Sequence, residues 1–151
     1  MPLEIAPEPT PPRLRDLRMV DQLFLWTVRH VVCAAEDGAP VNARLEDFFR
    51  DAGLPRVVAL TVALLRTLSA VATEAMTVNV PCGVQVLDDE YALLADLHRN
   101  AGHVHGLSAL RRKVDGAGSA IVAQRLHALA AQFDALDAMR GRRAPRTMLV
   151  H

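Results

Sequence analysis

Three histidines and one cysteine are the residues best suited to metal chemistry in this chain of 151 residues. His98, His103 and His105 lie close together in the sequence, and Cys82 precedes them. Zinc and haem iron are bound by neutral imidazoles and thiolates that converge from different backbone segments. A helix end followed by a glycine-containing turn could supply such a set, although no H-x₃-H or C-x₂-C pair is present. Alternatively, His98 is a partly buried histidine at a helix edge, and the other two face solvent.

The consecutive acids Asp88, Asp89 and Glu90 also resemble a chemical site. Catalytic carboxylates need different environments, because only then do their pKa values separate. Acids at a helix start have a simpler role, since they accept hydrogen bonds from free backbone N–H groups and complement the positive end of the helix. We therefore interpret these three residues as the start of a helix.

A cysteine nucleophile is a further hypothesis, with Cys82 as the candidate. It follows a proline in an expected turn, whereas Cys33 lies on an apolar helix and should behave as a small hydrophobic residue. Reactivity would require a cation or a helix N-terminus nearby to lower the thiol pKa. The chain has no glycine-rich phosphate loop, no G-x-S-x-G and no H-E-x-x-H sequence. We assign no catalytic residue.

Composition limits the class of protein. The 17 basic and 17 acidic residues balance, so net charge gives no reason to expect attraction to nucleic acids or membranes. All but one of the basic residues are arginine, a bias that indicates a GC-rich bacterial coding sequence. The longest apolar run, residues 57–76, contains Arg66 and Glu74, so we expect a buried core helix there. No stretch resembles a signal peptide, and we expect a cytoplasmic protein.

Hydrophobic periodicity predicts an all-α fold, a compact bundle of five to six helices in one domain over residues 13–140. Residues 1–12 are expected to be a flexible proline-rich arm, and residues 141–151 a flexible basic tail. Alternating residues around a Pro-x-Gly turn leave room for one short β-hairpin or extended loop near residues 77–86. The expected helices span residues 13–36, 42–52, 55–75, 88–100, 107–114 and 119–140.

Two of these helices have clear core faces. The third is expected to bury Val57, Leu60, Leu64, Leu68, Val71 and Ala75. The last has a heptad-like seam over two repeats: Val122, Leu126, Leu129, Phe133 and Leu136.

The first helix is apolar over most of its circumference. Its expected core face includes Val20, Phe24 and Val31, and its polar strip is limited to Arg18, Gln22 and Arg29. A helix with so much apolar surface is buried on several sides, by its own domain or by a partner. Tryptophan and methionine are also enriched at interface cores. The residues outside the core face are therefore candidates for an interface: Met19, Leu25, Trp26 and Cys33.

The order of these features resembles that of a family of small helical bacterial proteins that has no established activity. The resemblance covers residues 14–97 and rests on Leu54-Pro55-Arg56, on Pro81-Cys82 after a valine-rich stretch, and on residues 89–94. The family has helices flanking a cysteine-rich turn. Its members carry two or three consecutive cysteines where this chain has only Cys82 followed by Gly83. The resemblance implies a helical fold and transfers no activity.

Together these observations favour a non-enzymatic helical interaction or assembly module that acts as a homodimer. The apolar excess of the first helix and the seam of the last helix support it, because one domain of this size would have difficulty covering both. The alternative is a metal- or haem-binding protein that uses His98, His103 and His105 with Cys82. We expect no membrane partner and no nucleic acid, and the sequence identifies no cofactor.

Overall fold

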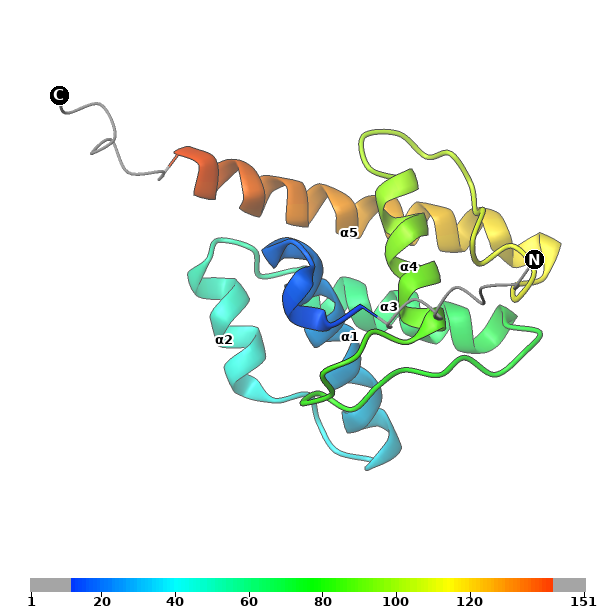
Figure 1. Cartoon of the computed structure of the whole chain (residues 1–151), viewed down its shortest axis with the longest axis horizontal. Coiled ribbons are helices and arrows are strands. Elements are labelled where there is room, and N and C mark those ends of the chain that lie inside the picture. The colour runs from blue at the N-terminus through cyan, green and yellow to red at the C-terminus, as the bar shows by residue number, and fades with distance from the viewer. Residues whose placement is uncertain (1–11, 143–151) are drawn as a thin grey trace, which may run out of the picture.

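The computed structural model describes residues 12–142, with side chains as far as Arg140. The expected arm before Pro12 and the expected tail after Arg142 lie outside these residues. Within them the chain forms a short 3₁₀ turn, five α-helices and no β-strand (Figure 1). The all-α bundle predicted from periodicity is confirmed. The elements are η1 (Leu14–Asp16), α1 (Met19–Glu36), α2 (Ala43–Asp51), α3 (Val57–Val71), α4 (Asp88–Arg99) and α5 (Gly116–Arg142).

The bundle is organised around the pairing of α3 with α5. Helix α5 begins where α3 ends, because the N–H of Asp115 donates to the carbonyl of Val71, and it then runs back along α3 (Figure 1). A β-carbon added at Gly118 would lie 2.4 Å from the Cβ of Val71. Only glycine permits so close an approach, so Gly118 sets the spacing of the two helices at this end.

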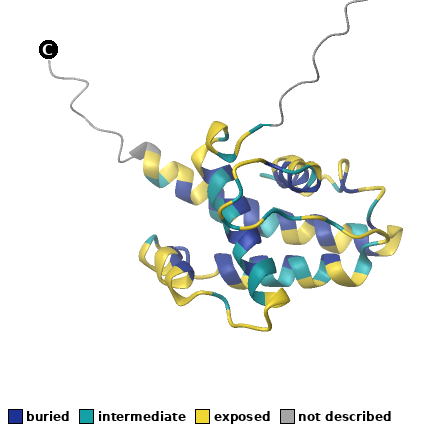
Figure 2. Ribbon diagram, turned by 60° about the horizontal axis from the view of Figure 1, so that its bottom comes forward, coloured by how far each residue is buried: buried dark blue, intermediate teal, exposed yellow. Residues whose placement is uncertain are grey.

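The core lies where α1, α2, α3 and α4 meet α5 (Figure 2). Phe133 of α5 makes edge-to-face contacts with Phe24 of α1 and Phe49 of α2, at ring-centroid distances of 5.8 and 6.1 Å. The whole α5 seam, from Val122 to Leu136, is buried within the chain. The seam is therefore covered by the chain itself and offers no surface for self-association.

Helix α3 buries its predicted face in part. Val57, Leu64 and Leu68 are buried as expected, whereas Leu60 and Val71 are half-buried. The prediction was wrong for Ala75, which is exposed beyond the end of the helix. Val58 and Thr61 are buried too, and the Thr61 hydroxyl donates to the carbonyl of Val57 at 2.8 Å, which satisfies it inside the core.

The first helix begins later than expected, at Met19 and not near Arg13. The preceding residues are held by contacts that a helix could not make. The N–H of Leu14 donates to the carbonyl of Val84, and the carbonyl of Pro12 accepts from Val86, so this segment lies along the loop between α3 and α4. Helix α5 begins earlier than expected, at Gly116, because the Asp115 carboxylate accepts from the N–H of Gly118 and caps it.

Of the two alternatives expected for residues 77–86, the extended loop forms and the hairpin does not, because one side of the segment pairs with residues 12–14 and not with its own first half. One expected helix does not form. Residues 107–114 form turns and not a helix. The Asp96 carboxylate accepts from the N–H groups of Ser108, Ala109 and Leu110, which bends this segment around the end of α4.

None of the helices in the described part of the chain is both long and apolar enough to cross a membrane.

Replacing Leu64 tests the assigned core. The side chain is fully buried, so Leu64→Ala should lower the free energy of unfolding by about 2–5 kcal/mol through lost burial and the cavity that remains. Urea denaturation measures this loss. Leu60→Ala is the matched control on the same helix and should cost less, because Leu60 is only half-buried. A loss below about 1 kcal/mol for Leu64→Ala would show that Leu64 does not lie on the buried face of α3.

Candidate functional site

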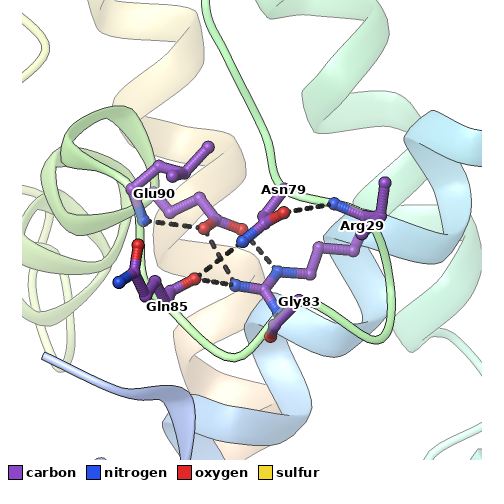
Figure 3. Close-up of polar contacts among 7 residues, drawn as sticks. Arg29, Asn79, Gly83, Gln85 and Glu90 are labelled. Atoms are coloured by element: carbon purple, nitrogen blue, oxygen red, sulfur yellow. Dashed lines mark hydrogen bonds and ion pairs between the residues drawn. The ribbon is translucent and has the colours of Figure 1, made fainter.

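A buried arginine holds the long loop that connects α3 to α4, residues 72–87 (Figure 3). Arg29 lies in the middle of α1 and has no exposed surface. Its Nη1 donates to the carbonyl of Gly83 at 2.7 Å, and its Nη2 donates to that of Gln85 at 2.8 Å. Sixteen residues without regular structure are unusual inside a compact fold and are often functional.

The charge of Arg29 is matched by Glu90, in the first turn of α4. Arg29 Nε donates to Glu90 Oε2 at 2.6 Å, and Nη2 donates to Oε1 at 3.0 Å. Glu90 Oε1 also accepts from the N–H of Leu87 at 3.0 Å, so the same carboxylate caps α4. Both side chains are fully buried. A buried ion pair is tolerated only when its remaining donors and acceptors are satisfied, and here backbone groups satisfy them.

Asp89 makes a second attachment between this loop and the bundle. Its carboxylate accepts from the N–H of Thr77 at 2.7 Å and forms an ion pair with Lys113. Burial alone would raise the pKa of Asp89. The hydrogen bonds from Lys113 and Thr77 outweigh burial, so this pKa lies below its ordinary value. The same bond from Lys113 to Asp89 raises the pKa of Lys113.

With the loop held in this way, a groove of about 1030 Å³ opens between α1, α3 and the first part of the loop. Its walls are mostly Ala, Val and Leu side chains. They come from the last turns of α1 (31–36), the following residues 39–41, the second half of α3 (62–69) and residues 72–78 of the loop, with Asp89 and Leu93 from α4.

The groove continues the core. Leu68 and Leu93 line it and also belong to the buried core cluster, and Val31, which is buried too, lines it beside them. Helix α1 therefore uses one face for both purposes: Phe24 and Val28 pack inside, while Val31 and Ala35 further along the same face line the groove. Exposed charges border the apolar walls, with Arg66 on α3, Glu36 on α1 and Glu74 on the loop.

The predicted metal residues are not brought together. The Nε2–H of His98 donates to Oδ1 of Asp21 at 2.8 Å, between α4 and α1. His103 and His105 are exposed on the following loop, with ring centroids 6.1 Å apart. Cys82 is exposed near the tip of the 72–87 loop. Over residues 12–142 no three His, Cys, Asp or Glu side chains are grouped so that they could hold a metal ion.

The four predicted interface residues have different positions. Leu25 is fully buried within the chain, so it cannot form part of a surface and that assignment was wrong. Met19 is exposed, and Trp26 and Cys33 are half-buried. These three recur every seven residues, so they lie in one line along α1, on the side opposite Val31 and Ala35. The rings of Trp26 and His30 pack edge to face, with their centroids 4.7 Å apart.

The environment predicted for three polar residues was wrong. Arg29 was expected on a polar strip of the first helix, and Asp89 and Glu90 were expected to act only as caps; all three are buried. One signal was available. Arg29 lies near Val28 and Val31 on a helix that is apolar over most of its circumference, and a cation among apolar neighbours requires a buried anion.

Comparison of the chain with protein-family models, with curated proteins and with solved structures gives no match.

Removing the charge of Arg29 tests its role in holding the loop. Arg29→Met leaves Glu90 buried without its cation, so the free energy of unfolding should fall by about 3–5 kcal/mol, measured with urea. The double variant Arg29→Met/Glu90→Leu should lose no more than the single variant, because the uncompensated charge is gone. A loss below about 1 kcal/mol in Arg29→Met would contradict the assigned pair.

The Asp89 attachment predicts a dependence of stability on pH. A carboxylate whose pKa is lower in the folded than in the unfolded state stabilises the fold above its ordinary pKa, about 4, and this contribution is lost as pH falls through the lower folded value. Asp89→Asn should therefore reduce the loss of stability between neutral and acidic pH. Urea midpoints across this range measure the difference, and equal slopes for variant and wild type would exclude the effect. Asp88→Asn, at the exposed neighbouring position, is the control.

Proposed function

We propose that this protein is a non-enzymatic helical interaction module that assembles as a homodimer through the groove between α1 and α3. The observation that carries this proposal is the open end of the core, where Leu68 and Leu93 are shared by the core cluster and the groove. Apolar surface of this extent on a small protein marks a site of interaction. A segment of a second chain laid into the groove would complete the core.

The chemistry of the groove favours a chain segment over a small ligand. Sites for small molecules place a few polar groups inside the cavity, where they orient the ligand. Here the exposed charges of Glu36, Arg66 and Glu74 border walls of mostly aliphatic side chains. Asp89 also lines the groove, but its carboxylate is already bound by Thr77 and Lys113. Binding of an apolar helix or loop in a groove between two helices requires only such walls and a polar rim.

The buried carboxylates support a role without catalysis. The carboxylates of Asp89, Glu90 and Asp96 are occupied by hydrogen bonds that hold the fold. His98 and Asp21 form a hydrogen-bonded pair, yet they line only a shallow depression of about 20 Å³, which is too small to enclose a substrate.

Two neighbouring positions on α3 provide a matched test. Ser69 and Ala70 are both exposed, but only Ser69 lines the groove. Ser69→Arg should place a cation among the apolar walls and raise the dissociation constant of the dimer about tenfold or more, while Ala70→Arg should leave it unchanged. Light scattering and sedimentation at micromolar concentration measure the dimer, and circular dichroism checks the fold of both variants.

The outcomes separate the possible interfaces. A wild type that is monomeric under these conditions would exclude the homodimer. A dimer that survives Ser69→Arg but is lost in Trp26→Glu would place the interface on the opposite side of α1, along Met19, Trp26 and Cys33.

A further inference from the structure

We infer that the partner segment is the tip of the 72–87 loop, residues 80–84, which inserts into the groove of a second copy while the second copy's tip inserts into the first. This inference rests on the proposed function and adds the identity of the inserted segment.

The tip is apolar and exposed. Val80 and Val84 have 58% and 60% of their surfaces accessible, and Pro81 and Cys82 lie between them. These are the most exposed of the large hydrophobic side chains in the described part of the chain. Exposed valines on both sides of a turn form a compact apolar projection, which matches the aliphatic walls of the groove.

The tip is also held in one conformation before any partner binds. The N–H of Gly83 donates to the carbonyl of Val80 at 2.9 Å and closes the turn. Arg29 binds the carbonyl of Gly83, and the Asn79 side chain donates to the carbonyl of Gln85 at 2.9 Å (Figure 3). A segment that is already ordered loses little conformational entropy on binding, so its apolar contacts contribute more fully to affinity.

The position of the tip suits a symmetric dimer. Met76 and Val78 line the groove, and the tip begins only two residues later along the same loop. An interface with two-fold symmetry uses the same patch on both copies, so it must contain a projection and a matching depression. The tip and the groove of one chain lie side by side and satisfy this condition. A two-fold rotation about an axis between tip and groove places the tip of each copy in the groove of the other copy.

The charges of the rim are self-complementary. Arg66 has a positive charge, Glu36 and Glu74 have negative charges, and none of the three forms an ion pair with any residue in the described range 12–142. In a two-fold arrangement, each Arg66 can face an acid of the other copy. Such pairs lie at the rim, where they contribute to orientation more than to affinity.

Cross-linking between two different variants tests this arrangement with the native tip thiol. The first variant, Cys33→Ala, keeps only Cys82. The second, Cys33→Ala/Cys82→Ala/Ala35→Cys, has a single thiol in the groove and carries an affinity tag that changes its size. Mixing them under mild oxidation should give a disulfide-linked heterodimer on a non-reducing gel.

The matched control replaces Ala35→Cys with Ala131→Cys, an exposed position on α5 outside the groove. We expect the groove thiol to cross-link to Cys82 about tenfold faster or more than the control thiol, because binding raises the effective concentration of the two sulfur atoms. Equal rates for the two positions would overturn the inference.

A second measurement does not depend on thiols. Val80→Glu/Val84→Glu alters two exposed side chains, so it should preserve the helical circular dichroism while raising the dimer dissociation constant about tenfold or more. If the wild type is monomeric, the proposed function and this inference both fail. If Ser69→Arg disrupts the dimer but the double tip variant does not, only the identity of the inserted segment is wrong.

Discussion

The buried pair of Arg29 and Glu90 is the interaction on which the shape of this protein most depends. It joins the middle of α1 to the first turn of α4, and two further bonds from the same guanidinium fix Gly83 and Gln85. The desolvation of two charges is costly, and the mutual attraction of such a pair offsets that cost only when the remaining donors and acceptors are also satisfied. Here the remaining Arg29 donors are satisfied by the backbone carbonyls of Gly83 and Gln85, so the 72–87 loop must be in place before the charges can be buried.

This dependence explains how a loop of 16 residues can form a wall of the groove without secondary structure of its own. A β-ladder would distribute the loop's hydrogen bonds over its length, whereas here they are concentrated at Arg29 and Asp89, with residues 12–14 along the outer edge. The first part of the loop, residues 72–78, then stands away from α1 and leaves the apolar faces of α1 and α3 uncovered. The groove is a consequence of where the loop is attached.

Sequence patterns predicted the helices well because those depend on local periodicity and capping. Asn42, whose side chain accepts from the N–H of Arg44, begins α2 as expected, and Leu64 and Leu126 are fully buried as the spacing indicated. The groove and the loop depend on contacts between residues far apart, such as Arg29 with Glu90, and no local pattern encodes which arginine is buried. The excess apolar surface of α1 indicated correctly that this helix is covered on several sides. Periodicity alone could not tell which apolar residues are buried in the core, such as Leu25, and which line the groove, such as Val32.

Helix α3 is a wall shared by two environments, because one side packs on α5 and another lines the groove. At its end, Gly118 leaves no room for a side chain beside Val71. A methyl group introduced there would act as a wedge between the helices, and α3 would have to shift toward the groove or rotate along its length. The position of this wall of the groove therefore depends on a residue behind it, because glycine there lets α3 lie close against α5.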